Sequence, residues 1–408
     1  MNRRSIVRPF LPLTCSLLAV AIMLQPAYAA GRSWVITPVS NPGVTGFNYL
    51  LGVTTLSPTL AWAVGAYRPT PNTSRVLIER WNGSTWTQVP GANPGTRNFL
   101  VDVAAWTAND VWATGSYLGA DNIGHALIEH FNGVSWSAVP APDVPGQDFN
   151  DLVGVAIRSP QDVFAVGLTR NYGGNFTGSV NAPPSPLAEH WNGTSWTRVS
   201  TPSTGSNGFG ELSTVSISGG TVLAVGDLGD AQGNYRPLVA RWNGSGFVQM
   251  PLPDTGPASE LSGVDLLSPQ DGWAVGDYYD AQGNDRTLAE HWNGSTWSIV
   301  PSPNVANGSQ PAASFFYDLS ALASNEIWAV GGYEDSSNVE HPLTEHWDGS
   351  AWSIIPSPTA RPNDSFLNDV AVVVNQGRAI SPSEALAVGS ASLDPEDSYW
   401  QPLAECYC

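Results

Sequence analysis

Four carboxylates in this chain stand at the start of a recurring apolar strand motif, and their chemistry is that of a cation site. Each lies four residues before the apolar anchor of its motif, at Asp151, Glu211, Glu260 and Asp318. Carboxylates that face one another repel, and a hard cation such as Ca²⁺ relieves that repulsion. We therefore expect a calcium site where these strands converge. The alternative is that each carboxylate caps a loop or faces water.

Aromatic side chains outside the repeated positions are the candidates for contact with a ligand. They lie in connections that vary between repeats, of which residues 168–186 form the longest. Variable loops on a rigid scaffold are where recognition usually resides. The expected ligand-binding residues are Tyr172, Phe176, Tyr235, Tyr278, Tyr279, Tyr333 and Trp400.

The sequence lacks the common catalytic motifs: it contains no Gly-x-Ser-x-Gly, no His-Glu-x-x-His and no phosphate-cradling loop. Glutamate–histidine pairs do recur, at residues 129–130, 189–190, 290–291 and 345–346. Adjacent residues of a strand point to opposite faces, so such a pair does not converge on one ion and is expected to be scaffold. Paired carboxylates also cleave glycosides, so an enzyme that acts through them stays an open alternative.

A repeated unit must position these residues. Six copies of a motif such as LAEHWNGSTWSIVP (288–301) recur at spacings of 50, 60, 51, 50 and 55 residues, and a WAVG-like motif occurs seven times. Each unit is typical of four short strands, and its Asn-Gly dipeptide predicts a type I′ hairpin turn, which needs positive φ at both central residues. The repeat therefore predicts an all-β fold, a seven-bladed β-propeller with four antiparallel strands in each blade.

The two ends of the chain together complete one unit. The seventh unit stops after PLAECYC (402–408) without a fourth strand, and RSWVITP (32–38) has the pattern of that strand. We expect this N-terminal strand to complete the last blade and close the ring, which removes the open ends of a linear stack of sheets. Residues 31–408 would then form a single domain.

The unit at residues 327–355, IWAVGGY…PLTEHWDGSAWSII, resembles the kelch-type propellers. It has an apolar strand that ends in Gly-Gly, then an aromatic residue, then a Trp. The chain is also similar to secreted bacterial proteins built from WNGSxWSxVPSP repeats. The resemblance extends over the whole chain after residue 30 and implies the propeller fold and a recognition role. A fold alone does not assign an activity.

The first thirty residues have the pattern of a secretory signal peptide, with Arg3, Arg4 and Arg8 ahead of an apolar run and AYAA (27–30) for cleavage. No later segment reaches the ~20 apolar residues that a membrane span needs. Three of the 16 basic residues and none of the 35 acidic ones lie in this segment, so the remainder carries a formal charge of −22. Such a chain repels nucleic acids and anionic lipids, whereas cations, neutral sugars and basic protein patches are compatible partners.

These observations favour a secreted, non-catalytic recognition module that binds an extracellular protein or a carbohydrate on its variable-loop face. We expect a monomer, with Ca²⁺ as the only cofactor that the residues suggest. Two alternatives stay open. One is a carbohydrate-active hydrolase or lyase that uses the carboxylates at the channel mouth, and the other is a structural cell-surface protein that binds no small ligand.

Overall fold

The computed structural model describes residues 32–43, 46–172, 182–204, 208–229, 234–256, 258–307, 310–358, 363–373, 384–394 and 399–408. The chain divides into two units, Met1–Gly31 and Arg32–Cys408, and all described residues belong to the second. In the described ranges every regular element is a β-strand. This part of the chain contains no long apolar helix of the kind that crosses a membrane.

The strands form antiparallel sheets with a repeated layout, in which consecutive strands lie side by side. Five sheets have four strands each. The first comprises β2 Tyr49–Ser57, β3 Leu60–Thr70, β4 Thr73–Trp81 and β5 Trp86–Gln88. The second comprises β14 Gly210–Ser218, β15 Thr221–Gly229, β16 Tyr235–Trp242 and β17 Phe247–Gln249. The third comprises β18 Ser259–Ser268, β19 Asp271–Tyr279, β20 Asp285–Trp292 and β21 Trp297–Ile299.

The last two of these sheets lie toward the end of the chain. One comprises β24 Ser314–Ala323, β25 Glu326–Glu334, β26 Glu340–Trp347 and β27 Trp352–Ile354. The other comprises β28 Ser365–Val372, β29 Ala385–Ser392, β30 Trp400–Tyr407 and β1 Trp34–Ile36. A small two-stranded sheet, β22 Ala306–Asn307 and β23 Gln310–Pro311, lies in the connection after β21.

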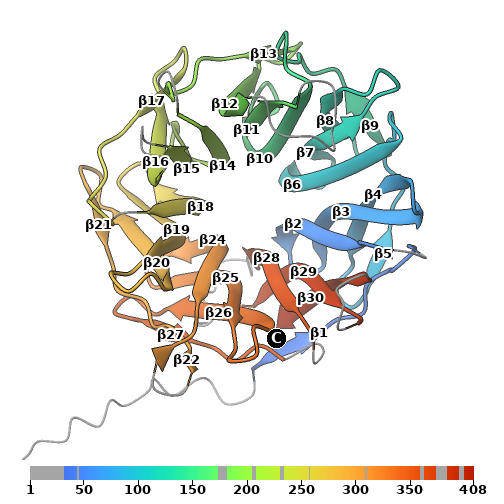
Figure 1. The fold of residues 1–408 in the computed structure, drawn as a ribbon. Helices are drawn as coiled ribbons and strands as arrows, with labels where there is room; N and C mark the ends of the chain where they lie inside the picture. Colours follow the sequence, from blue (N-terminus) through green and yellow to red (C-terminus); the bar gives the residue numbers. More distant parts are fainter. Residues whose placement is uncertain are drawn as a thin grey trace, which may run out of the picture. The chain divides into compact units, whose positions relative to one another are not determined.

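A further sheet has eight strands and consists of two four-stranded halves. The first half comprises β6 Arg97–Thr107, β7 Asp110–Leu118, β8 Gly124–Phe131 and β9 Trp136–Val139. The second half comprises β10 Phe149–Ser159, β11 Asp162–Asn171, β12 Ala182–Trp191 and β13 Trp196–Arg198. The halves meet in one parallel pair, Phe149 with Gly124. Within residues 32–408, the four-stranded sheets and the two halves of the eight-stranded sheet follow one another around a ring, each with its first strand innermost (Figure 1).

The N-terminal strand pairs with the C-terminal strand, as the sequence predicts. β1 is antiparallel to β30, with Trp34 opposite Tyr407 and Ile36 opposite Glu405. The Trp34 ring packs edge-on against Trp328 of the preceding sheet, with 5.2 Å between centroids. Cys406 and Cys408 form a disulfide at the end of β30. Residues from both ends of the described chain therefore complete one sheet.

Tryptophan at the repeated positions packs neighbouring sheets together. Trp62 of β3 is fully buried and lies 4.9 Å from Phe131 and 5.4 Å from Trp136 of the next unit, centroid to centroid. Trp112 makes the same contacts one unit further along, with Trp191 and Trp196. Aromatic rings in such tilted and edge-on arrangements stabilise a core through buried area and ring geometry. The repeated tryptophans are therefore scaffold.

The glutamate and the histidine of a Glu-His pair lie on opposite faces of their strand, as the pair at residues 129–130 illustrates. Glu129 is fully buried, accepts the Ala92 amide at 2.9 Å, and has a pKa that burial raises to about 7. His130 binds Asp110 at 2.8 Å and stacks on Trp112 with 4.3 Å between centroids. The glutamate thus bonds to the preceding unit and the histidine to its own sheet, so this pair has a structural role.

The Asn-Gly turns differ from the predicted type. Gly83 has a φ of 98°, but Asn82 is not among the residues with positive φ, so the turn is not type I′. Trp81 pairs with Trp86, which leaves four residues in the loop. The Asn82 side chain accepts the amides of Ser84 at 2.9 Å and Thr85 at 3.0 Å. An Asn side chain that binds the backbone two residues ahead forms a turn without positive φ of its own.

Candidate functional site

The inner strands β2, β6, β10, β14, β18, β24 and β28 surround a central channel. Two cavities of about 280 Å³ lie along it, and one of them contacts all of these strands. A larger cavity of about 630 Å³ lies at the end where the inner strands begin, which we call the mouth. The larger cavity shares Leu51, Val101, Tyr317 and Asn368 with one of the smaller ones.

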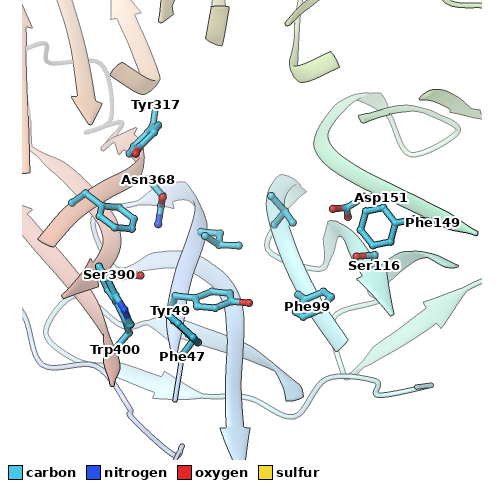
Figure 2. A pocket seen from close by; sticks show the side chains of 13 residues that line it. Phe47, Tyr49, Phe99, Ser116, Phe149, Asp151, Tyr317, Asn368, Ser390 and Trp400 are labelled. Carbon is cyan, nitrogen blue, oxygen red and sulfur yellow. The ribbon is translucent and has the colours of Figure 1, made fainter. Parts of the chain in front are cut away.

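One side of the mouth is an aromatic wall, shown in Figure 2 together with the polar residues beside it. Its rings come from the inner strands, from β30 and from the segment before β2. The aromatic wall consists of Phe47, Tyr49, Phe99, Phe149, Tyr317, Phe366 and Trp400. Such a concave, mostly apolar surface with a few polar groups is the usual form of a ligand site.

The strand alternation aims these rings at the cavity. Tyr49 and Leu51 line the cavity, whereas Leu50 between them is fully buried in the core. Side chains of a strand alternate between its two faces, so one residue contributes to the cavity and the next to the scaffold. Phe99 and Phe366 occupy the register of Tyr49, because all three lie opposite the residue that follows the glycine of the WAVG-like motif.

The glycine of the WAVG-like motif is required because the backbone of the inner strand passes very close to it. A Cβ on Gly167 would lie 2.0 Å from the carbonyl oxygen of Asp151 on the inner strand. No side chain fits at that distance, so the second strand needs glycine there. The same contact recurs at Gly65 with Tyr49 and at Gly226 with Glu211. The glycine therefore fixes the inner strand against the second strand at the residue that faces the mouth.

The rings of the aromatic wall support one another. Trp400 stacks on Phe47 with 6.5 Å between centroids and lies 5.4 Å from Phe366, which in turn lies 5.8 Å from Tyr317. The guanidinium of Arg68 lies 5.1 Å from the centre of the Phe47 ring. Burial raises the pKa of Tyr49 to about 12. Four rings of the wall, from Phe47 through Trp400 and Phe366 to Tyr317, thus form one contiguous apolar surface.

Asp151 is the acidic residue of the larger cavity. Burial raises its pKa to about 6, and the nearby Ser116 hydroxyl and Arg170 oppose that rise. Glu211, on the next inner strand, raises it further. Because Glu211 lines the smaller cavity that shares four residues with the larger one, the aromatic wall adjoins a second, acidic side of the mouth.

The acidic wall consists of Glu211, Asp227, Glu260 and Asp277. Glu211 of β14 lies opposite Asp227 of β15, and Glu260 of β18 lies opposite Asp277 of β19. Burial raises the pKa of Asp227 to about 8, with further contributions from Glu211 and Glu260. Burial and the adjoining Glu260 carboxyl, with which Asp277 shares a hydrogen bond, raise the pKa of Asp277 to about 8. Arg170 pairs with Glu211 at 3.5 Å.

The predicted set of four carboxylates is wrong in one member. Asp151, Glu211 and Glu260 occupy the mouth register, but Phe315 occupies it in β24, opposite Gly332. Asp318 lies three residues further into the channel, at the level of Asp102 and Asp369, because the residue four positions before the apolar anchor Leu319 is Phe315. Among the described residues, no three acidic, histidine or cysteine side chains are grouped so that they could hold a metal ion. Calcium binding remains a prediction.

Asp318 belongs to a second set of acidic residues, Asp102, Asp318 and Asp369, which lie three positions further into the channel than the mouth register. We call this level of the channel the waist. Asp102 accepts the amide of Val155 at 2.7 Å, and Asp369 accepts the amide of Val53 at 2.6 Å, in each case on the next inner strand. Burial raises the pKa of both carboxyls, to about 7 for Asp102 and about 6 for Asp369. Burial and the hydrogen-bonded Asp369 also raise the pKa of Asp318.

Sequence reasoning missed Asp102 and Asp369. Both stand three residues after the mouth position, a spacing that Gly52 and Gly154 share. A Cβ on Gly52 would lie 2.8 Å from the Cα of Asp102, so glycine at this position lets neighbouring inner strands approach directly. The sequence signal that could have identified this level is the recurrence of aspartate or glycine three residues after the mouth position. These aspartates bridge strands, and their oxygens are occupied by backbone amides.

The structure separates the predicted ligand-binding residues. Trp400 lines the larger cavity, and Tyr172 lies 5.9 Å from Phe149, centroid to centroid. Tyr235 and Tyr279 are about half exposed, at 47% and 44%. Phe176 lies outside the described residues. Tyr278 packs against the core beside Trp297, and Tyr333 packs beside His341.

No protein-family model matches the chain, and no curated protein sequence matches it. Two solved structures are similar over nearly its full length. One is YCF48 bound to D1 peptide, at 14% identity, with 92% of this chain and 96% of that chain covered and a TM-score of 0.51. The other is the polysaccharide lyase PL25 ulvan lyase bound to -[GlcA(1-4)Rha3S]-, at 11% identity, with 89% and 94% covered and a TM-score of 0.54. This similarity and the sheet layout together show a β-propeller fold.

Proposed function

We propose that this chain is a seven-bladed β-propeller whose channel mouth is a non-catalytic recognition site for an extracellular protein or carbohydrate. The observation that carries the proposal is the 630 Å³ cavity at the mouth and its aromatic wall. A cavity of this size accommodates a side-chain cluster or a sugar ring and buries it against apolar surface.

The count of seven blades rests on the eight-stranded sheet. Its halves, β6–β9 and β10–β13, each have the same order of four strands as the other sheets, and one parallel pair joins them. We interpret this single pair as a contact between neighbouring blades, because the first three strands within each half pair along their length. Counted as two blades, this sheet brings the ring to seven.

The carboxylates at the waist support a binding role over catalysis. Asp102 and Asp369 each accept two backbone amides, one on their own strand and one on the next. A carboxylate that accepts one amide on each oxygen is held in place as a bridge between strands, which is a structural role. Asp151 is the residue that keeps the enzymatic alternative open, because a carboxyl with a pKa of about 6 in a cavity suits general acid catalysis.

The charge of the chain restricts the ligands that we propose. The ulvan lyase of similar fold is bound to a saccharide that contains glucuronate, and YCF48 is bound to a peptide. With a formal charge of −22 after residue 30, this chain repels acidic polysaccharides. We propose neutral glycans or uncharged and basic polypeptides instead. Residues 1–30 are proposed to direct secretion, and the chain to act as a monomer of the kelch-like type.

Binding of the purified protein to a glycan array and a peptide array tests the proposal. Trp400→Ala should reduce binding of any captured ligand at least tenfold, because Trp400 stacks on two other rings of the wall. Trp106→Ala is the matched control, since Trp106 is 46% exposed and does not line the cavity. Repeating the assay with calcium and with a chelator tests whether calcium contributes to binding. Equal binding by both variants would contradict the proposed site.

Turnover is measured on the same preparations. If a captured glycan is cleaved, and Asp151→Asn abolishes cleavage while the fold is retained, the enzymatic alternative replaces the binding proposal. If neither array captures a ligand, the structural alternative is favoured.

A further inference from the structure

The acidic wall gathers four carboxyl groups. They come from two neighbouring sheets and lie in two cross-strand pairs. Arg170 pairs with one of them, at 3.5 Å from Glu211. Carboxyls placed opposite each other repel when both are ionised, and burial together with this repulsion raises the pKa of Asp227 and Asp277 to about 8. A positively charged ligand group beside these carboxyls favours their ionised form and displaces the protons.

Asp227 supplies an independent observation that points to a ligand. The residue is only 3% exposed, and its Oδ2 atom has no hydrogen-bond partner. Asp227 lies directly opposite Glu211 across β14 and β15, and Glu211 and Glu260 add to the rise that burial causes in its pKa. A buried polar atom without a partner costs roughly 1–3 kcal/mol. A donor brought by a ligand would remove that cost, and because the half-buried Glu211 and Glu260 beside Asp227 are acidic, a cationic donor fits.

The acidic wall and the aromatic wall form one continuous surface. Tyr317 lines the 630 Å³ cavity, and burial together with the Glu340, Asp277 and Glu260 carboxyls raises the pKa of its hydroxyl. Glu211 lines the 280 Å³ cavity that shares Tyr317 and Leu51 with the larger one. A ligand that fills the aromatic cavity therefore meets Glu211 at its edge, and Glu260 holds the same register on the next inner strand.

We propose that the mouth recognises a basic polypeptide segment in which an arginine or lysine head binds Glu211 and Glu260 while an adjoining apolar side chain fills the aromatic cavity. This inference rests on the proposed function and selects the basic polypeptide among its ligands. Arginine and lysine combine an apolar stem with a cationic head, so they match a surface that changes from aromatic to acidic over a short distance. The formal charge of −22 also steers such a segment toward the protein.

The test uses three fluorescent hexapeptides that differ at one position each. The first holds a tryptophan next to an arginine, the second replaces the arginine with citrulline, and the third replaces the tryptophan with alanine. Citrulline keeps the shape of arginine and removes its charge. We expect the first peptide to bind at least tenfold more tightly than either of the others, and its affinity to fall as the salt concentration rises.

Two variants locate the charge. Glu211→Gln/Glu260→Gln should weaken the arginine peptide at least tenfold and leave the citrulline peptide within twofold. Glu334→Gln is the control for a glutamate outside the acidic wall: it replaces one exposed carboxyl, where the double variant replaces two, and it should change affinity less than twofold. The comparison between peptides is made on the unaltered protein, so it stands even where the double variant unfolds.

The outcomes separate this inference from the function on which it rests. Equal binding of the arginine and citrulline peptides would overturn the inference, as would an affinity for arginine that does not depend on Glu211 and Glu260. If the arginine peptide fails to bind but an array ligand is lost in Trp400→Ala, the proposed function survives and the inference does not. If small organic cations such as guanidinium compete fully with the peptide, the polypeptide assignment is overturned.

Discussion

Two adjacent positions on the inner strands differ in how much their residue type varies from strand to strand. The mouth position holds aromatic rings in some strands and carboxylates in others, namely Tyr49, Phe99, Asp151, Glu211, Glu260, Phe315 and Phe366. The next position holds a large apolar residue in every inner strand, and each is fully buried: Leu50, Leu100, Leu152, Leu212, Leu261, Phe316 and Leu367. One residue along the strand thus separates a variable surface from a constant one.

The difference follows from the two-residue period of a strand. A side chain in the core must match the volume of its neighbours, because protein interiors are close-packed. A side chain that faces a channel has no such requirement, so its chemistry is free to follow the ligand. Substitutions at the constant positions should therefore lower stability, and substitutions at the mouth should change binding instead.

The largest effect is expected for Trp328→Ala, in the core on the second strand of its sheet, β25. Trp328 is fully buried and contacts Trp34 of the N-terminal strand and Tyr407 of the last strand. Removing such a side chain costs about 3–5 kcal/mol in the free energy of unfolding. Denaturant unfolding followed by circular dichroism measures it. A loss below about 1 kcal/mol would show that Trp328 does not hold the last two sheets together.

A smaller loss is expected for Asp369→Ala, at the waist. The substitution leaves the amides of Val53 and Val370 without their acceptor, which costs about 2–3 kcal/mol. Asp151→Ala is the matched control at the mouth, because burial already raises the pKa of Asp151. Its free energy of unfolding should stay the same or rise. A larger loss for Asp151→Ala than for Asp369→Ala would contradict the division between waist and mouth.

Stability should fall with rising pH, and the buried repeat glutamates are one cause. Burial raises the folded-state pKa of Glu189 to about 8, above its value in the unfolded chain. The folded state then binds the proton more tightly, so this contribution is present below the unfolded pKa and is lost as the pH rises through the folded pKa. We expect the protein to unfold at a lower temperature at pH 8 than at pH 5. Calorimetry at both values measures the change.

Glu189→Gln isolates the contribution of one such group. Glutamine keeps the shape and stays neutral, so the variant should lose about 2 kcal/mol less between pH 5 and pH 8 than the unaltered protein. An exposed control, Glu334→Gln, should leave the pH dependence unchanged. Higher stability at pH 8 than at pH 5 would contradict the assignment of neutral buried glutamates.

The smallest effect on stability is expected for Phe99→Ser, at the mouth. Phe99 lines the cavity and is only half-buried, so its removal should change the free energy of unfolding by less than about 1 kcal/mol. Binding of a captured ligand should nevertheless fall. A loss of stability as large as that of Trp328→Ala would show that the aromatic wall is part of the core.

Local pattern was sufficient to predict the strands and the completion of the last sheet. Trp34 was expected to occupy the position of the repeated tryptophan, and it lies opposite Tyr407 in the last sheet. The turn type was predicted wrongly at Asn82, because the side chain supplies acceptors for two amides and removes the need for positive φ. Asp318 was also predicted wrongly at the mouth, because the apolar anchor of its unit is Leu319, which puts Phe315 in the mouth register.

The sequence by itself determined the repeated sheets, their aromatic contacts and the strand that joins the chain's two ends, because each is written in the periodicity of adjacent residues. The tertiary structure alone decided which residues share the mouth. Phe47, Tyr317 and Trp400 are far apart in the chain and meet only when the inner strands surround one channel. The division of that mouth into aromatic and acidic walls is likewise a property of the ring, since the residues of each wall come from different strands.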